Sequence, residues 1–182
     1  MKGIVFTEFL GMVDDTFGPV VTDSVVSDVD PPSGGVYMTL GTYSCEELIA
    51  LLHTLEQRVG MTMPALLRTY GRHLFGRFVV HHPELIQRYY DSFSMLERLD
   101  DTIHKEVRRH YPDSELPRFT CRRESPDHMI MVYSSLRPLA DLAQGMMEGC
   151  GQHFGEVLAI ERTDHQDDKL NVSTFRLRRL PM

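Results

Sequence analysis

Apolar residues recur every three or four positions through the first half of the chain, which is the spacing of one buried helix face. The first such stretch stops at Gly18-Pro19, and residues 27–35, with two prolines and two glycines, are expected to be the least ordered. A second helix is predicted after Ser44, because Glu47 three residues on would complete a capping box. The inward positions of these two helices are Phe6, Phe9, Leu10, Val13 and Phe17, then Leu48, Leu51, Leu52 and Leu55.

Prolines mark the starts of the next helices. Pro64 is expected to open a helix over residues 65–80 and Pro83 a short one, since the first helical turn tolerates proline. A longer helix is predicted from about Ser94 to His110. Its inward positions are Leu96, Leu99, Ile103 and Val107.

The last third of the chain changes from helical to extended patterns. The predicted elements are strands at 118–123, 128–137, 156–163 and 170–180, a helix at 138–154 that begins with Pro138, and a polar turn, DHQDD, before the last strand. Helices come first and a hairpin-rich sheet crossed by a helix follows. This order predicts an α+β fold, and 182 residues are the length of one domain.

Composition narrows the class of protein. The chain is 42% hydrophobic and 25% charged, as ordinary globular domains are. Its 26 acids exceed its 19 bases, for a net charge of −7, and the bases form no broad stripe, which argues against nucleic acid as a partner. We expect no membrane span and no secretory signal, because the chain lacks a long uninterrupted apolar run. These features predict a cytoplasmic protein.

The three cysteines, Cys45, Cys121 and Cys150, are far apart and never form a CxxC pair. Neither a disulfide framework nor a cysteine zinc site is indicated. We expect buried structural thiols, with a reactive thiol as the alternative.

Tyr133, Ser135 and Arg137 form a Y-x-S-x-R pattern at the end of a predicted strand. Because side chains alternate in a strand, the three would share one face along about 13 Å. All three donate hydrogen bonds, and arginine can fork onto a carboxylate. The pattern is suited to a ligand with one or two carboxylates, although an exposed polar face without a ligand is the alternative.

His104 lies at the edge of the apolar stripe of the helix predicted over 94–110. A neutral imidazole there could bind a metal or the iron of haem, or could simply be a buried histidine bonded to a backbone carbonyl. The adjacent His81 and His82 would point about 100° apart on a helix, so we expect them to be surface residues. No HExxH, GxSxG, P-loop or GxGxxG motif is present, and an enzyme is not predicted.

Taken together, the segments MKGIVF, DDTIHKEVRRHYPDSELPRF and YSSLR resemble the H-NOX family of haem-nitric oxide/oxygen binding domains, in order and over essentially the whole chain. The resemblance implies a single domain. A helical lobe would span about 1–63, and an α/β lobe over about 64–182 would enclose haem b between an antiparallel sheet and helices.

The resemblance also implies roles for individual residues. His104 would bind the haem iron, and Tyr133, Ser135 and Arg137 would hold the two propionates. Pro117 would press on the porphyrin. The apolar wall of the pocket would consist of Val5, Phe9, Leu74, Phe78, Leu142 and Met146.

The function implied by the resemblance is a nitric oxide sensor of the bacterial stand-alone type. Leu142 stands where oxygen-binding relatives carry a tyrosine, and Leu74 is apolar too, so O₂ would find no hydrogen bond whereas NO and CO would bind. In the family, NO weakens the iron–histidine bond. Because the given sequence contains no kinase or cyclase module, the signal is expected to pass to a separate histidine kinase or cyclic-di-GMP enzyme. The alternative is a non-haem interaction module of the same fold, in which His104 and Arg137 are incidental.

Overall fold

Three helices at the N-terminus pack around one of the two apolar clusters of the chain. In the computed structural model, which describes residues 1–181, they are α1 (Gly3–Phe17), α2 (Pro19–Val29) and α3 (Cys45–Val59). The break after α1 falls at Gly18, whose φ of 88° suits a residue without a side chain. Pro19 then starts α2, so part of the stretch that the sequence marked as least ordered is helical.

The start of α3 differs in detail from its prediction. Ser44 caps the helix by accepting a hydrogen bond from the backbone N–H of Glu46, at 3.1 Å. The expected capping box with Glu47 does not form. The carboxylate of Glu47 instead accepts hydrogen bonds from Ser33 and Tyr37. These two contacts fix the loop that leads into α3.

The rest of the chain builds a second layer of helices and one sheet. Its elements are α4 (Met63–His81), α5 (Pro83–Ile86), α6 (Ser92–Leu96), a π-helical segment η1 (Leu99–His104), α7 (Lys105–His110), β1 (Arg118–Ser125), β2 (His128–Ser135), α8 (Ala140–His153), β3 (Val157–Asp167) and β4 (Leu170–Leu180). The strands form one antiparallel sheet in the order β1-β2-β4-β3. This arrangement confirms the α+β prediction.

Three strand ends differ from the sequence prediction, and the first is that of β1, which ends at Ser125, two residues later than predicted. The pairing of β3 with β4 continues to Asp167 opposite Leu170, so the turn is only Asp168-Lys169 rather than the whole DHQDD stretch. Strand β2 ends at Ser135, two residues earlier than predicted.

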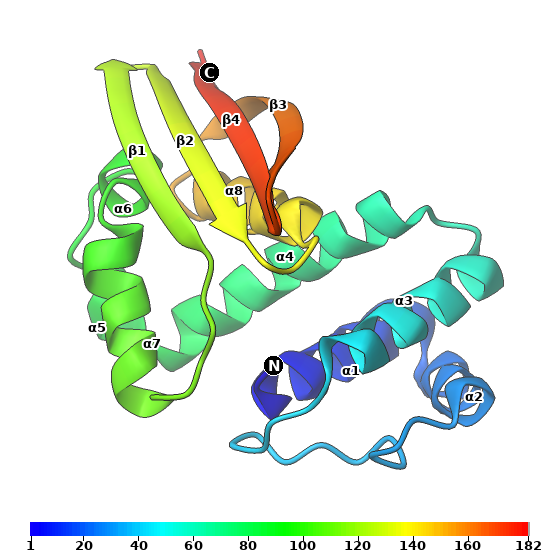
Figure 1. The fold of residues 1–182 in the computed structure, drawn as a ribbon. Coiled ribbons are helices and arrows are strands. Elements are labelled where there is room, and N and C mark those ends of the chain that lie inside the picture. Colours follow the sequence, from blue (N-terminus) through cyan, green and yellow to red (C-terminus); the bar gives the residue numbers. More distant parts are fainter. Residues whose placement is uncertain (182) are drawn as a thin grey trace.

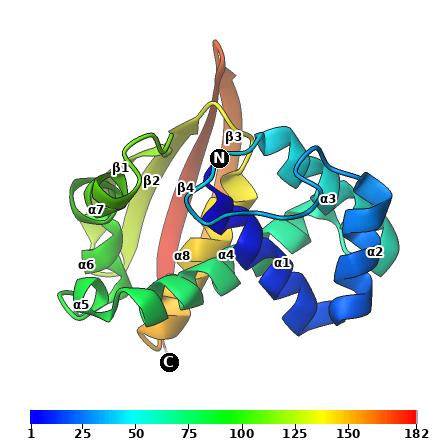
Figure 2. The ribbon, with the colours of Figure 1, turned by 90° about the horizontal axis from the view of Figure 1, so that it is seen from below.

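Two apolar clusters occupy the interior, and α4 belongs to both. Leu66, Leu67 and Tyr70 in the first half of α4 are buried with α1–α3, whereas Phe75 in its second half is buried with α6, α8 and the sheet. Figure 1 shows α4 running beneath the sheet, and Figure 2 shows α1–α3 on one side of it and α5–α7 on the other. Helix α4 therefore connects the two halves of the molecule.

Helices α4 and α8 cross at two glycines that leave no room for a side chain. A Cβ on Gly71 would lie 2.3 Å from the carbonyl oxygen of Leu142, and one on Gly145 would lie 2.2 Å from that of Arg68. Backbone atoms cannot yield as a flexible side chain can. The two glycines therefore set the separation of the helices.

We expect Gly145→Ala to destabilise the protein by about 1–3 kcal/mol, because the added methyl group overpacks the crossing. Gly76→Ala is the matched control on α4, since a Cβ there meets nothing within 4 Å. It should be neutral or stabilising by up to about 1 kcal/mol, the helix-propensity gain of alanine over glycine. Urea unfolding measures both, and equal stability of the two variants would contradict the steric account.

Among residues 1–181, no helix combines the length and the apolar character needed to cross a membrane.

Candidate functional site

The segment that carries His104 is not the single α-helix predicted over 94–110. It consists of α6, the π-helical η1 that ends at His104, and α7. Ile103 and His104 are buried, but Val107 is only partly so. A π-helical turn carries an extra residue per turn and often occurs at functional positions. Here it places His104 in the interior at the end of η1.

The side chain of His104 is held by a carboxylate. Its Nδ1 lies 2.6 Å from Oδ1 of Asp100, and the residue is only 9% exposed. Burial lowers the pKa of His104, and the neighbouring charge of Asp100 opposes this only in part. The imidazole is therefore neutral near pH 7, with its proton on Nδ1. Nε2 has no hydrogen-bond partner among residues 1–181.

Asp100 is itself fixed to the sheet. Its Oδ2 accepts a hydrogen bond of 3.1 Å from the backbone N–H of Phe119, near the start of β1. The ring of Phe119 lies 5.7 Å from that of His104 and 5.5 Å from that of Tyr133. Because Phe119 and Tyr133 are register partners on β1 and β2, the sheet brings His104 toward the Y-x-S-x-R pattern.

The prediction that the three Y-x-S-x-R residues share one strand face is wrong for Arg137. Tyr133 and Ser135 belong to β2, but Arg137 lies beyond its end, in the loop to α8. The hydroxyl of Tyr133 donates to the carbonyl of Arg137 at 3.1 Å, and the backbone N–H of Arg137 donates to Oγ of Ser135 at 3.0 Å. These two side chains therefore fix the backbone that presents the arginine.

The guanidinium of Arg137 contacts the loop that contains Pro117. It donates to the carbonyl of Glu115 at 2.9 Å and to its carboxylate at 2.5 Å. The side chain of Arg137 is only 20% exposed, whereas that of Glu115 is 72% exposed. The arginine is thus a shielded cation whose present partner is a solvated carboxylate. Pro117 is partly buried two residues further on.

The predicted apolar wall residues come from three helices. Those that are partly exposed are Val5 of α1, Leu74 and Phe78 of α4, and Leu142 and Met146 of α8. Phe9 is fully buried and packs edge-on to Tyr70, with ring centroids 5.4 Å apart. The hydroxyl of Tyr70 donates to the carbonyl of Val5 at 2.5 Å, which joins α4 to α1.

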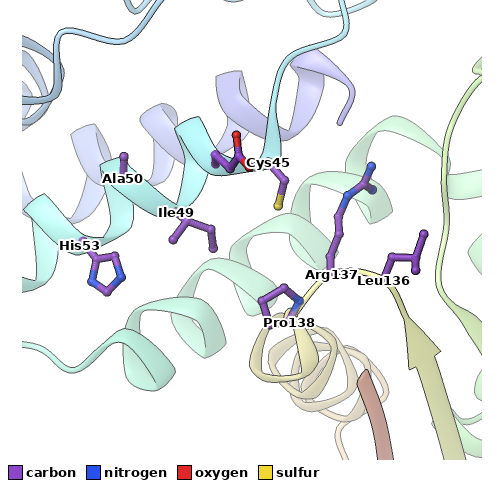
Figure 3. Close-up of a pocket in the computed structure, with 8 residues that line it drawn as sticks. Cys45, Ile49, Ala50, His53, Leu136, Arg137 and Pro138 are labelled. Atoms are coloured by element: carbon purple, nitrogen blue, oxygen red, sulfur yellow. The ribbon is translucent and has the colours of Figure 1, made fainter. Parts of the chain in front are cut away.

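A surface hollow of about 460 Å³ lies beside the loop that carries Arg137. Figure 3 shows it between α3, which contributes Cys45, Ile49 and His53, and the turn formed by Leu136, Arg137 and Pro138. His104 does not line it. Arg137 is the one residue shared by this hollow and the predicted site.

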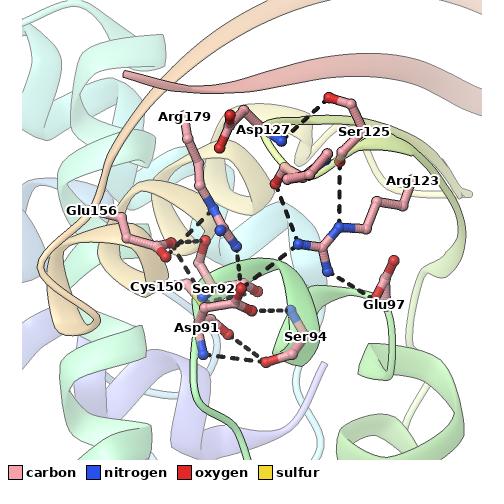
Figure 4. Close-up of polar contacts among 11 residues, drawn as sticks. Asp91, Ser92, Ser94, Glu97, Arg123, Ser125, Asp127, Cys150, Glu156 and Arg179 are labelled. Atoms are coloured by element: carbon pink, nitrogen blue, oxygen red, sulfur yellow. Dashed lines mark hydrogen bonds and ion pairs between the residues drawn. The ribbon is translucent and has the colours of Figure 1, made fainter. Parts of the chain in front are cut away.

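A partly buried ionic cluster ties the start of the His104 segment to the sheet (Figure 4). Asp91 caps α6 through the backbone N–H of Ser94 at 2.6 Å and pairs with Nη2 of Arg179 on β4 at 2.6 Å. The guanidinium of Arg179 lies 4.3 Å from the ring centroid of Phe93. Glu156 accepts hydrogen bonds from the backbone N–H and hydroxyl of Ser92 on α6. No local pattern predicts this cluster, because its members are up to 88 residues apart in the sequence.

We expect Asp91→Asn to lower the free energy of unfolding by about 1.5–3 kcal/mol at pH 7, the worth of hydrogen bonds to a charged group. Burial alone would raise the pKa of Asp91, but the Ser94 N–H and Arg179 outweigh it and hold the pKa below 3.8. The carboxylate's contribution is therefore present above this pH and is lost as the pH falls through the folded-state pKa. The difference between variant and wild type should shrink in acid.

Glu97→Gln is the control for Asp91→Asn, because Glu97 is a third exposed and lies 3.6 Å from its partner Arg123. Its effect should stay within about 1 kcal/mol. Denaturant titrations at pH 7 and below pH 3.8 measure both variants, and a pH-independent effect of Asp91→Asn would contradict the ionic account.

The cysteines and the paired histidines form no site of their own in residues 1–181. All three thiols are free, and burial raises the pKa of each, that of Cys121 to about 12. A thiol with a raised pKa is a poor nucleophile at neutral pH, which favours a structural role. The side chains of His81 and His82 are 49% and 37% exposed, as expected of surface residues.

Comparisons with known proteins show the family to which the chain belongs. A family model described as haem-NO-binding matches residues 2–162. The chain belongs to the H-NOX family. An unliganded Fe(II) H-NOX protein from K. algicida is 33% identical, with a TM-score of 0.92 over 100% of this chain and 98% of that one. An H-NOX mutant from S. oneidensis in the Fe(II) state is 25% identical, with a TM-score of 0.89 over 100% and 97%. A search of the curated proteins gave no match.

H-NOX domains are haem-binding gas-sensor modules, and the residues of this chain fit a haem. The donor set is one neutral histidine with a free Nε2, which is what an axial iron ligand requires. Arg137 supplies a shielded cation of the kind that carboxylates bind. Partly exposed apolar side chains on three helices suit a porphyrin face.

Proposed function

We propose that this H-NOX chain is a haem-based nitric oxide sensor that excludes O₂ and passes its signal to a separate protein. The observation that carries the proposal is the geometry of His104. The ring is buried and neutral, its Nδ1 is fixed on Asp100, and Nε2 is left for iron. His104 would hold haem b, which when bound would supply a ferrous iron that binds diatomic gases.

The propionates would be held at the end of β2. Arg137 supplies the positive charge, and the side chains of Tyr133 and Ser135 fix the backbone of Arg137 by hydrogen bonds. Propionates would compete with Glu115 for the guanidinium, and an ion pair with a solvated carboxylate such as that of Glu115 is weak. Pro117, in the same loop as Glu115, would border the porphyrin.

Exclusion of O₂ follows from the chemistry of the apolar wall. Bound O₂ carries partial negative charge and gains from a hydrogen-bond donor, which Leu74 and Leu142 cannot provide. Val5, Phe9, Phe78 and Met146 are equally without polar hydrogens. Tyr70 is buried in one apolar cluster with Phe9, against which Val5, Leu74 and Leu142 pack, but its hydroxyl donates its hydrogen bond to the carbonyl of Val5. NO and CO need no such donor.

Signalling requires that the site be coupled to the helical lobe. Helix α4 carries Leu74 and Phe78, and also Tyr70, whose bond to Val5 holds α1. A change at the haem would therefore reach α1 through packed, hydrogen-bonded elements. A histidine kinase or a cyclic-di-GMP enzyme would receive the signal in the cytoplasm.

The first test of this function is the absorbance spectrum. Purified wild-type protein should show a Soret band, and His104→Gly should lose haem or hold it only with added imidazole, because glycine leaves a cavity of imidazole size. His110→Gly is the control, since His110 is an exposed histidine six residues along the same segment. Normal haem content and an unchanged spectrum in His104→Gly would show that another residue binds iron.

The second test concerns gas selectivity. Ferrous wild-type protein in air should show no stable spectrum of an O₂ complex, although NO and CO change its spectrum. Leu142→Tyr should raise O₂ affinity by about one to two orders of magnitude, since a hydrogen bond to a charged acceptor contributes about 1.5–3 kcal/mol and about 1.4 kcal/mol is tenfold.

Leu142→Phe is the matched control, because it adds the ring without the hydroxyl. It should bind O₂ no better than wild type. A long-lived O₂ complex of the wild-type protein would refute the NO-sensor proposal and indicate an oxygen sensor.

A further inference from the structure

We propose that Asp100 is a positioning residue for His104: it fixes the tautomer and orientation of the imidazole and strengthens Nε2 as a donor to iron. The inference rests on the proposed haem function. On it, the Asp100 carboxylate would set the strength of the iron–histidine bond and the reduction potential of the iron.

The contact between the two side chains is short and shielded from solvent. Oδ1 of Asp100 lies 2.6 Å from Nδ1 of His104, in the range of charge-assisted hydrogen bonds. The side chains are 31% and 11% exposed. Because water has little access to the histidine ring, it competes weakly with the carboxylate for the Nδ1 proton.

The carboxylate is not free to turn away. Its second oxygen accepts the backbone N–H of Phe119 at 3.1 Å, so Asp100 bridges the π-helical segment η1 and strand β1. A side chain held at both oxygens has one position. The imidazole ring that it orients is therefore fixed relative to the sheet rather than only to its own helix.

This arrangement has two chemical consequences for Nε2. With the proton of the neutral ring on Nδ1, the lone pair is on Nε2, which is the form that binds a metal. Partial transfer of charge from the carboxylate makes the imidazole more basic, as outer-shell carboxylates do at other histidine–metal sites. A more basic, more negative ligand stabilises ferric over ferrous iron and so lowers the reduction potential.

Asp101 provides an internal control. It is the next residue in η1 and carries the same charge, but it is exposed and makes no hydrogen bond or ion pair within residues 1–181. Asp100→Asn and Asp101→Asn thus remove one charge each from adjacent positions. Only the first removes the charge that touches His104.

The experiment compares haem-loaded wild type, Asp100→Asn and Asp101→Asn. In Asp100→Asn, the ferrous iron–histidine stretching frequency in resonance Raman spectra should fall. The equilibrium between ferric and ferrous haem should shift about tenfold toward the ferrous form, which is the lower end of the effects of outer-shell residues. A tenfold shift raises the midpoint potential by about 59 mV for a one-electron couple. Asp101→Asn should match wild type in both readouts.

A second measurement needs no variant at Asp100. In the diamagnetic CO-bound wild type with ¹⁵N-labelled histidine, the Nδ1 proton of His104 should give an NMR signal that exchanges slowly with solvent. A proton that exchanges as fast as that of free imidazole would overturn the inference, and so would Asp100→Asn with the wild-type Raman frequency and potential. Wild-type protein without a Soret band would instead refute the proposed function itself.

Discussion

The hydrogen bond between Asp100 and His104 is the contact on which the site depends. A histidine buried in an apolar interior could turn either nitrogen toward a ligand, and the carboxylate removes that choice. Because Asp100 is also bound to the N–H of Phe119, the constraint passes to the sheet. The sheet in turn sets where Tyr133 and the Arg137 loop lie, since Phe119 and Tyr133 are opposite each other on β1 and β2.

The segment around His104 is attached at both ends to the same sheet. At its start, Asp91 and Glu156 join α6 to Arg179 of β4, and farther along Asp100 joins η1 to β1. The helical lobe is connected differently, through the close crossing of α4 and α8 and through the Tyr70–Val5 bond. One side of the site is thus joined to strands by hydrogen bonds and ion pairs, whereas the other is held by helix packing.

Much of the fold could be predicted from the sequence, because local rules determine it. Proline at helix starts, glycine at helix ends and three-to-four spacing located α1, α3, α4 and α8, and alternation located the strands. The α+β class followed from their order. The errors arose where tertiary contacts override local pattern. Glu47 forms no capping box, because its carboxylate accepts hydrogen bonds from Ser33 and Tyr37. The single helix expected over 94–110 is interrupted by the π-helical segment η1.

The candidate site was predictable only in part, for the same reason. His104 and the Y-x-S-x-R residues were proposed from residue type and spacing, and the family match confirms the resemblance that they carry. Asp100 was missed, although its position four residues before His104 is the spacing at which helical side chains meet. Glu115 and Arg179 could not be found, because no local pattern identifies partners that only the folded sheet and loops bring to Arg137 and Asp91.

The most direct test of the account is an anomalous difference map at the iron absorption edge from a crystal of the haem-loaded ferrous protein. The account predicts a single iron peak within bonding distance of Nε2 of His104, with Nδ1 still on the carboxylate of Asp100. An iron peak beside any other residue, or a His104 ring turned so that Nδ1 faces the iron, would contradict it.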